Sequence, residues 1–319
     1  MLLEVKDLKT YFHTRRGVVK AVNGVSFTLD AGKTLGLVGE SGSGKSITAL
    51  SLLRLVPEPA GRIAGGEILL DGEDLVKKSA REMRRIRGAK VSMILQDSMM
   101  SLNPVYTVGN QVAESIIAHQ SIPRGEVHSK VVEMLRLVRI PAPERRAKQY
   151  PHEMSGGMRQ RVSGAIAFSC QPSLLICDEP TTSLDVTIQA QYLKLLKDIQ
   201  RETGVAVLFI THDLGVVAKI CDDIAVMYAG RIVEMAPAME LLTRPMHPYT
   251  EALMKCLPSL DKNVSRLPSI QGAPPTLLQM PPGCSFWPRC PDVRPACKEQ
   301  YPPFIALNEH HSASCWKLS

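Results

Sequence analysis

The 319-residue sequence lacks any hydrophobic run that approaches the roughly 18–20 residues needed to span a bilayer. Its first residues, MLLEVKDLKTYF, carry early acidic and basic side chains and lack the hydrophobic stretch of a signal peptide. We therefore expect a cytoplasmic or membrane-peripheral protein. Aromatic residues make up only 5% of the chain, which argues against a surface on which nucleic-acid bases stack.

The composition that remains is that of a globular protein. Hydrophobic residues account for 45% and charged residues for 22%, and the length allows two or three subdomains around a large core. The net charge of +7, from 38 Lys and Arg against 31 Asp and Glu, suits a phosphate ligand or an anionic surface. It does not by itself indicate nucleic acid.

Residues 39–46, GESGSGKS, form a complete phosphate-binding loop of the pattern G-x-x-x-x-G-K-[ST]. Its glycines allow backbone N–H groups to surround phosphate oxygens, Lys45 can reach the β- and γ-phosphates, and the Ser46 hydroxyl can bind Mg²⁺. The apolar run Thr34–Val38 predicts a buried parallel strand before the loop, and Ser46–Val56 predicts a helix that ends at Pro57. The nucleotide-binding residues expected here are Gly39, Ser41, Gly42, Ser43, Gly44, Lys45 and Ser46.

The rest of the chain alternates between strand and helix patterns. Residues 1–38 predict short strands with turns at Asn23-Gly24 and Asp30–Gly32. Thirteen of the 23 prolines lie beyond Pro237, which indicates an appended region, part helix and part loop. The further elements predicted are helices at Val108–His119, Glu126–Val138, after Gly157, Val186–Glu202 and Tyr249–Cys256, and strands at Gly66–Asp71, Val91–Gln96, Leu174–Cys177, Val205–Ile210, Ile224–Met227 and Ile232–Glu234.

Two acids follow the apolar run Leu174–Cys177. In a protein with a phosphate-binding loop, the first, Asp178, holds Mg²⁺ and the second, Glu179, can deprotonate the attacking water. Without the loop, two solvated acids at the end of a strand would be the better interpretation. Gln96 and His212 also end apolar strands, but neither residue indicates a function by itself.

A second anion site is predicted at Ser155-Gly156-Gly157, where a helix begins. The Ser155 hydroxyl and the free N–H groups lie at the positive end of that helix. The alternative is an ordinary N-cap formed by Ser155.

The order of these motifs resembles that of the ATP-binding subunit of ABC transporters, over residues 1 to about 240. The matching features are the phosphate-binding loop, Gln96, Ser155–Arg161 (SGGMRQR), Asp178-Glu179, Ser183-Leu184-Asp185 and Thr211-His212-Asp213. The oligopeptide/dipeptide importer branch is indicated by Gln96-Asp97-Ser98 before Ser101–Pro104, Met158 after Ser-Gly-Gly, His247–Thr250 and the four-cysteine tail. Met154 departs from the Leu common before Ser-Gly-Gly, an apolar change of similar volume.

The resemblance implies an α/β fold, namely an ABC-type P-loop ATPase core with a RecA-like parallel sheet and an antiparallel β subdomain, plus a helical subdomain and a C-terminal extension. The expected boundaries are 1–96 and 171–240 for the two halves of the core, 97–170 for the helical subdomain and 241–319 for the extension.

The resemblance also implies a head-to-tail dimer with two ATP molecules at its interface. Ser155, Gly156 and Gly157 would complete the site of the partner, and Asp185 would cross the interface. Gln96 would sense Mg²⁺, the γ-phosphate and the membrane subunits, and His212 would contact the γ-phosphate. Phe12 is favoured over Tyr11 as the aromatic residue that stacks on adenine. Mg²⁺ would be held by Ser46, Gln96 and Asp178.

Four cysteines, Cys284, Cys290, Cys297 and Cys315, lie within the last 36 residues with the spacing C-x5-C-x6-C-x17-C. Disulfides are disfavoured in a cytoplasmic chain, and structural zinc prefers closely paired cysteines that are absent here. The spacing leaves zinc and an iron–sulfur cluster about even, and the resemblance favours [4Fe–4S]. We expect the cluster to be remote from the ATP chemistry. The other four cysteines read as buried hydrophobic residues.

The function expected from the resemblance is the ATP-hydrolysing subunit of a dipeptide or oligopeptide importer. Its partners would be a second ATPase subunit, either identical or homologous, two transmembrane permease subunits and, indirectly, an extracellular solute-binding protein. It would lie on the cytoplasmic face of the cell membrane. Import of nickel or another small solute is the alternative, and a soluble ATPase acting on nucleic acid is disfavoured because the tail lacks basic–aromatic alternation.

Overall fold

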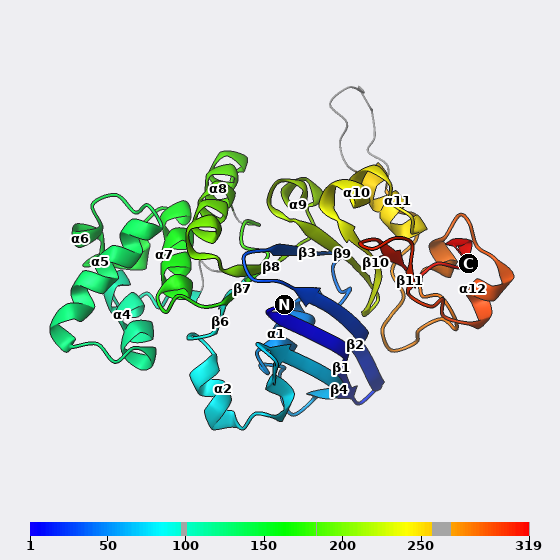
Figure 1. Ribbon diagram of the computed structural model, residues 1–319, viewed down its shortest axis with the longest axis horizontal. Helices are drawn as coiled ribbons and strands as arrows, with labels where there is room; N and C mark the ends of the chain where they lie inside the picture. Colours follow the sequence, from blue (N-terminus) through cyan, green and yellow to red (C-terminus); the bar gives the residue numbers. More distant parts are fainter. Residues whose placement is uncertain (97–100, 183, 257–268, 319) are drawn as a thin grey trace.

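The computed structural model describes residues 1–96, 101–182, 184–256 and 269–318. Asp97, Ser98 and Ser183 of the motifs above lie outside these ranges. In Figure 1 a central sheet is flanked at one end by a group of helices and at the other by the C-terminal extension. A smaller sheet lies beneath the central one. None of the described helices combines the length and apolar character needed to cross a membrane.

The central sheet has the strand order β11-β12-β10-β9-β3-β8-β7-β6. Its parallel part joins β9, β3, β8, β7 and β6, which are apolar and buried almost throughout, as expected for a sheet covered on both faces. The bounds of these five strands are β3 Thr34–Val38, β6 Val91–Ile94, β7 Leu174–Asp178, β8 Ala206–Thr211 and β9 Asp223–Tyr228. Strand β10, Arg231–Pro237, pairs antiparallel with β9, so the two form a hairpin.

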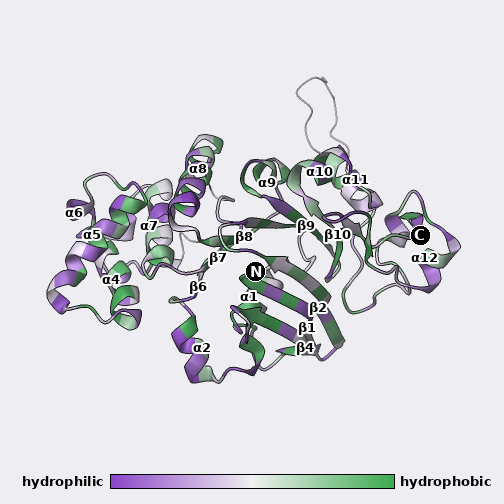
Figure 2. Cartoon of the chain, viewed as in Figure 1, coloured by the Kyte–Doolittle hydropathy of each residue, from purple (hydrophilic) through white to green (hydrophobic). Residues whose placement is uncertain are grey.

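The smaller sheet is antiparallel, with the order β2-β1-β4-β5. Its strands are β1 Leu3–Thr14, β2 Gly17–Leu29, β4 Gly61–Leu70 and β5 Glu73–Asp74. The expectation of short strands at the N-terminus is wrong, because β1 and β2 have 12 and 13 residues. Asn23-Gly24, read as a turn, lies inside β2, where Gly24 has a φ of 85°. Hydrophobic residues follow the strands of both sheets in Figure 2.

The helical subdomain is built from α4, α5, α6 and α7, with bounds Val108–His119, Val127–Leu137, Pro143–Arg146 and Gly156–Phe168. Its apolar side chains join a cluster that continues onto the central sheet through residues such as Val207 and Phe209. The remaining helices of the core are α1 Lys45–Leu52, α2 Ala80–Ile86, α8 Val186–Thr203 and α9 Leu214–Ile220. The predicted bounds of α4 agree with the structure, where the Thr107 hydroxyl caps the helix.

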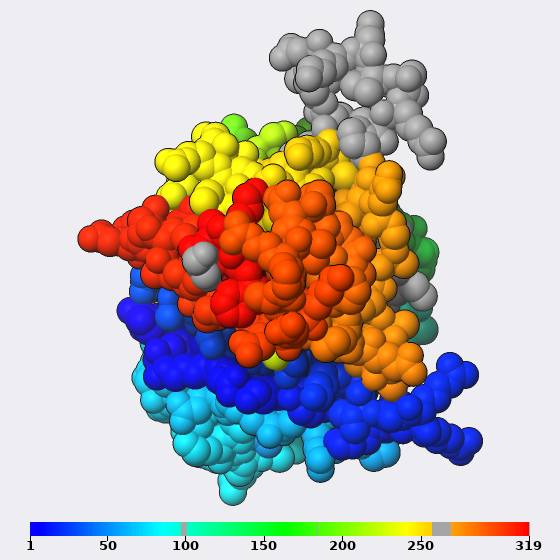
Figure 3. Space-filling view, turned by 90° about the vertical axis from the view of Figure 1, so that its right-hand side faces the viewer, coloured from blue at the N-terminus to red at the C-terminus, as the bar shows by residue number. Residues whose placement is uncertain are grey.

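The C-terminal extension contains α10 Ala238–Thr243, α11 Pro248–Lys255, α12 Pro295–Glu299 and two short strands, β11 Ile305–Ala306 and β12 Ser312–Ala313. Because β12 pairs with β10, the extension continues the central sheet instead of consisting of helix and loop alone. Figure 3 shows it covering one side of the molecule, between α10–α11 and the N-terminal strands.

Candidate functional site

The phosphate-binding loop joins the end of β3 to the start of α1, as predicted. Gly39 and Gly44 have φ values of 153° and 107°, which L side chains rarely adopt. A Cβ atom at Gly39 would collide with the carbonyl oxygen of Met227, and one at Gly44 with that of Ala21. These two glycines therefore allow the loop to lie directly against its neighbouring strands.

Lys45 is buried at the first position of α1. Its ammonium nitrogen donates to the carbonyl oxygens of Gly39 at 2.8 Å and Glu40 at 3.0 Å. Burial lowers the pKa of this ammonium, and the nearby carboxylates of Glu179, Asp178 and Glu40 oppose that effect. An ammonium so held, at a helix N-terminus lined by backbone N–H groups, is suited to bind phosphate.

Two of the three predicted magnesium ligands also meet. The Ser46 hydroxyl lies 3.1 Å from a carboxylate oxygen of Asp178, the last residue of β7. Burial raises the pKa of Asp178, aided by the charge of Glu179 and opposed by the Ser46 hydrogen bond and by Lys45. A hydroxyl and a partly buried carboxylate are the oxygen ligands that Mg²⁺ takes beside nucleotide phosphates.

Glu179 lies at the centre of the predicted catalytic group. Its carboxylate is 3.1 Å from the Gln96 amide, 3.0 Å from His212 Nδ1 and 3.1 Å from the Thr182 hydroxyl. Burial acts to raise its pKa, but the hydrogen bond and charge of His212, with Thr182 and Lys45, lower it overall. The carboxylate is therefore ionised at neutral pH and able to accept a proton.

These residues meet because they follow neighbouring parallel strands. Gln96, Glu179 and His212 come just after β6, β7 and β8, and β3 leads into the loop. The carboxyl ends of these strands share one edge of the sheet. Glu179 has a φ of 45°, uncommon for a side chain of this kind and typical of residues constrained at functional sites. Thr182 was not predicted, although it lies three residues after Glu179.

Ser155, Gly156, Gly157 and Asp185 are not gathered with this group in the contacts described. Ser155 is exposed at the N-cap of α7, and its hydroxyl accepts from the Met158 backbone at 3.3 Å. Asp185 caps α8 in the same way, at 2.9 Å from the Ile188 nitrogen. A Cβ at Gly157 would lie 2.8 Å from Ile188 Cγ2, so this glycine allows α7 to approach α8.

The two candidates for adenine stacking have different neighbours. The Tyr11 hydroxyl donates to the Asn23 side chain at 2.9 Å, and Lys20 lies over the Tyr11 ring at 5.8 Å. Phe12 packs against Gly61, where a Cβ would be 2.6 Å from its ring. The preference for Phe12 stays a prediction.

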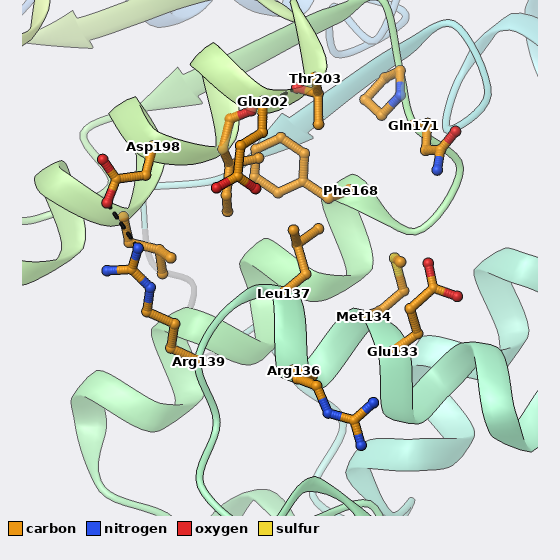
Figure 4. Close-up of a pocket in the computed structure, with 13 residues that line it drawn as sticks. Glu133, Met134, Arg136, Leu137, Arg139, Phe168, Gln171, Asp198, Glu202 and Thr203 are labelled. Atoms are coloured by element: carbon orange, nitrogen blue, oxygen red, sulfur yellow. Dashed lines mark hydrogen bonds and ion pairs between the residues drawn. The ribbon is translucent and has the colours of Figure 1, made fainter.

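A cavity of about 700 Å³ lies elsewhere, between α5, the end of α7 and α8 (Figure 4). Its floor includes Leu137 and Phe168, and the ion pair between Arg139 and Asp198, at 2.8 Å, lies at its side. It shares no residue with the group around Lys45 and Glu179.

The four C-terminal cysteines are free thiols, and Cys284 interacts electrostatically with Cys290, Cys297 and Cys315. Burial and these neighbours raise the pKa of Cys284 to about 11. Within the described ranges, no three or more His, Cys, Asp or Glu side chains are gathered closely enough to hold a metal ion. Neither the iron–sulfur nor the zinc expectation is confirmed.

The segment that carries these cysteines contacts the phosphate-binding loop. Arg289, next to Cys290, forms an ion pair with Glu40 of the phosphate-binding loop at 2.7 Å. Tyr249 of α11 accepts a hydrogen bond from the Glu40 backbone at 2.9 Å. Sequence reasoning singled out Tyr249 only as part of the His247–Thr250 motif and missed Arg289, because a contact more than 200 positions away gives no local signal.

Comparison with known proteins identifies the family. Residues 22–182 match the family model described as ABC transporter. The chain belongs to the ABC transporter family. As an ABC-type ATP-binding protein it is an ATPase, and its cassette fold is that of the solved family members. Residues 233–297 match a second model, described as the C-terminal region of oligopeptide/dipeptide transporters.

Individual relatives extend over nearly the whole of this ABC ATPase. It is 52% identical over 318 residues to a probable peptide ABC transporter ATP-binding protein of Sinorhizobium fredii, covering 99% of this chain and 95% of the relative. It is 48% identical to the dipeptide transport ATP-binding protein DppD of Bacillus subtilis, covering 99% and 94%. The dimeric structure of the bacterial ABC transporter cassette MJ0796 matches with a TM-score of 0.66 and 25% identity, over 74% and 99% of the two chains.

Proposed function

We propose that this ATPase powers the import of dipeptides or oligopeptides through a membrane transporter. The observation that carries the proposal is the convergence of Lys45, Ser46, Asp178 and Glu179 at one sheet edge, in a chain whose C-terminal region matches that of peptide transporters. The relatives named for peptide and dipeptide transport support this substrate class.

In the proposed reaction, Lys45 and the loop backbone bind the ATP phosphates, and Ser46 and Asp178 hold Mg²⁺ with help from Gln96. Mg²⁺ would neutralise charge on the phosphates. Glu179 would accept a proton from the water that attacks the γ-phosphate, and His212 would hold that carboxylate in place. In the structure His212 and Gln96 contact Glu179 directly, which supports a role in orienting it.

Two cassettes would close head to tail, each supplying Ser155–Gly157 to the ATP bound by the other. The exposure of Ser155 and its place at the N-terminus of α7 support a site completed across a dimer. The helical insert, around residues 96–109, would transmit closure to two permease subunits on the cytoplasmic face of the membrane. The cassette partner would be a second copy or a homologous subunit.

The decisive test is uptake of labelled dipeptide by cells that lack this chain and carry it back on a plasmid. Uptake should return with the wild type and fail with Glu179→Gln. Restored nickel uptake without peptide uptake would establish the alternative solute. Co-purification with nucleic acid instead of membranes would contradict both. The genes beside this one, above all one for a solute-binding protein, would narrow the substrate.

We also propose that Cys284, Cys290, Cys297 and Cys315 bind one [4Fe–4S] cluster with a structural or regulatory role. The mutual interactions of these thiols support it, as do main-chain N–H groups that donate to each sulfur, including Arg294 to Cys297 Sγ at 3.4 Å.

Protein purified without oxygen should be brown and contain close to four iron and four sulfide per chain. Replacing any one of the four cysteines with Ser should remove the colour, whereas Cys177→Ser, a buried core position, should retain it. Colourless protein with one zinc and no sulfide would refute the cluster.

A further inference from the structure

Arg289 occupies a site that satisfies every hydrogen-bond donor of its guanidinium group. Nη1 and Nη2 form a bidentate ion pair with the Glu40 carboxylate at 2.7 and 3.0 Å. Nη1 also reaches the Tyr228 hydroxyl at 3.4 Å. The other contacts are from Nη2 to the Ile270 carbonyl at 3.4 Å and from Nε to the Gln271 carbonyl at 3.0 Å. Only 4% of the side chain is exposed.

An aromatic wall surrounds this ion pair. Phe286 of the extension packs against Tyr228 and Tyr249, with ring centroids 5.3 Å apart in both pairs, and all three rings are buried. The Arg289 guanidinium lies 6.0 Å from the Tyr228 and Phe286 ring centroids. The guanidinium is thereby shielded from water, while 26% of the Glu40 side chain stays exposed, and the pair is stronger than one in which both groups lie on the surface.

Glu40 is the second residue of the phosphate-binding loop, and it is held at three points. Arg289 binds its carboxylate, the Tyr249 hydroxyl accepts from its backbone nitrogen, and its carbonyl oxygen accepts from Lys45 and from the Ser43 backbone. Two of these contacts, those of Arg289 and Tyr249, come from the C-terminal extension. The position of the loop therefore depends on residues about 200 or more positions away.

We propose that Arg289 is a positioning residue of the phosphate-binding loop, through which the C-terminal extension sets the affinity of the site for nucleoside triphosphate. Two effects act together. The guanidinium neutralises a carboxylate that would otherwise face the incoming triphosphate and compete for Lys45. Its two hydrogen bonds to Glu40 also fix the loop before the nucleotide binds, which lowers the entropic cost of binding. The proposal rests on the proposed role of this loop in ATP binding.

The test is ATP binding to the purified full chain, measured with a fluorescent ATP analogue and by competition with unlabelled ATP. Arg289→Gln should weaken binding about tenfold, because a charge-assisted pair is lost and Glu40 is left without a partner. Arg289→Lys keeps the positive charge but not the planar group that forms two parallel hydrogen bonds. Its affinity for ATP should lie between those of the wild type and Arg289→Gln. In the assembled transporter, KM for ATP should rise while kcat stays within about twofold, because Glu179 is untouched.

A double-mutant cycle separates this mechanism from simple damage to the extension. Glu40→Gln alone should weaken ATP binding less than Arg289→Gln does, since it leaves no uncompensated negative charge at the loop and its amide oxygen can still accept from Arg289. Arg289→Gln combined with Glu40→Gln should recover part of the affinity lost in Arg289→Gln, because the uncompensated charge is gone while the bidentate pair stays lost. Arg289→Lys keeps the proposal testable should Arg289→Gln fold poorly.

Two matched variants serve as controls. Arg139→Gln breaks an ion pair of similar length in the helical subdomain. Asn308→Ala breaks hydrogen bonds within the extension, one to Glu240 of α10 and two from the backbone of His310 and His311. Both should bind ATP as the wild type does. Unchanged affinity in Arg289→Gln would overturn the positioning role, and a double variant at least as weak as the single one would overturn the neutralisation of Glu40. Failure of the wild type itself to bind ATP would instead contradict the proposed function.

Discussion

The two halves of the nucleotide site on this chain differ in how far they are assembled. Lys45, Asp178 and Glu179 are part of a network of hydrogen bonds, partly buried and supported from behind by the C-terminal extension. Ser155 and Asp185 are exposed, and in the contacts described each caps only its own helix. The first half is formed before any partner arrives, whereas the second presents a helix N-terminus outward. Catalysis on this scaffold would therefore be limited by the meeting of two chains.

The largest effect expected from a single substitution lies at the centre of the assembled half. Glu179→Gln keeps the shape of the side chain, replaces one acceptor oxygen with an NH2 group and cannot accept a proton. ATP turnover should fall by a factor of about 10² to 10⁴ while ATP binding persists, and an ATP-bound dimer should accumulate. Steady-state hydrolysis and size-exclusion chromatography with ATP would measure both.

Glu144→Gln is a matched control, because Glu144 forms only an exposed ion pair with Arg136. Its turnover should equal that of the wild type. Normal hydrolysis in Glu179→Gln would show that another group accepts the proton.

Removal of the buried ammonium should act on binding instead of turnover. Lys45→Ala should weaken the binding of ATP to the isolated chain by roughly 10- to 100-fold, because charge-assisted hydrogen bonds to phosphate are lost. Isothermal titration would measure it, with Lys9→Ala, which loses only an exposed pair with Asp7, as the control. Normal ATP affinity in Lys45→Ala would contradict the role of the loop.

Ser155→Ala tests the other half of the comparison. The isolated chain should bind ATP normally, and ATP-driven dimerisation should weaken by about tenfold, since one hydroxyl to the partner's nucleotide is lost. Thr107→Ala is a matched control: Thr107 caps α4 with the same 3.3 Å hydrogen bond, so both variants lose a cap of about 1 kcal/mol. Equal loss of dimerisation in both would assign Ser155 a capping role alone.

The assembled half could be predicted from sequence because its motifs are contiguous and follow apolar strands that must lie side by side. Once β3, β6, β7 and β8 are placed in one parallel sheet, Gln96, Glu179 and His212 meet without further assumption. The ABC-type ATPase fold that the family resemblance implied was also confirmed.

What the sequence did not reveal depends on contacts between distant residues. The ion pair of Arg289 and Glu40 joins positions 249 apart, and neither residue differs locally from a solvated charge. The length of β1 was missed because register shifts between Val5 and Lys9 interrupt its alternation of apolar and polar residues. Strands β11 and β12, of two residues each, are too short to show a period.

The smallest effect expected concerns the helix that supports the assembled half from behind. His247 is buried at the N-cap of α11, its Nδ1 accepts from the Tyr249 backbone at 3.0 Å, and burial lowers its pKa to about 3. Its usual pKa is 6.5, so below that pH the unfolded chain binds a proton that the folded chain refuses. The contribution of the neutral His247 to the free energy of unfolding is therefore fully present above about pH 6.5. It is lost as the pH falls toward 3, by at most about 1.4 kcal/mol per pH unit.

His247→Asn keeps a side-chain acceptor at the cap but cannot be protonated. Between pH 7 and pH 5, its thermal unfolding midpoint should fall less than that of the wild type, while His128→Asn, an exposed position on α5, should follow the wild type. Because the imidazole of the folded chain stays neutral at pH 5.5, the ATP affinity of the folded wild type at that pH should equal that of His247→Asn. Parallel pH profiles of the unfolding midpoint for His247→Asn and the wild type would show that the buried imidazole does not set the acid sensitivity of the fold.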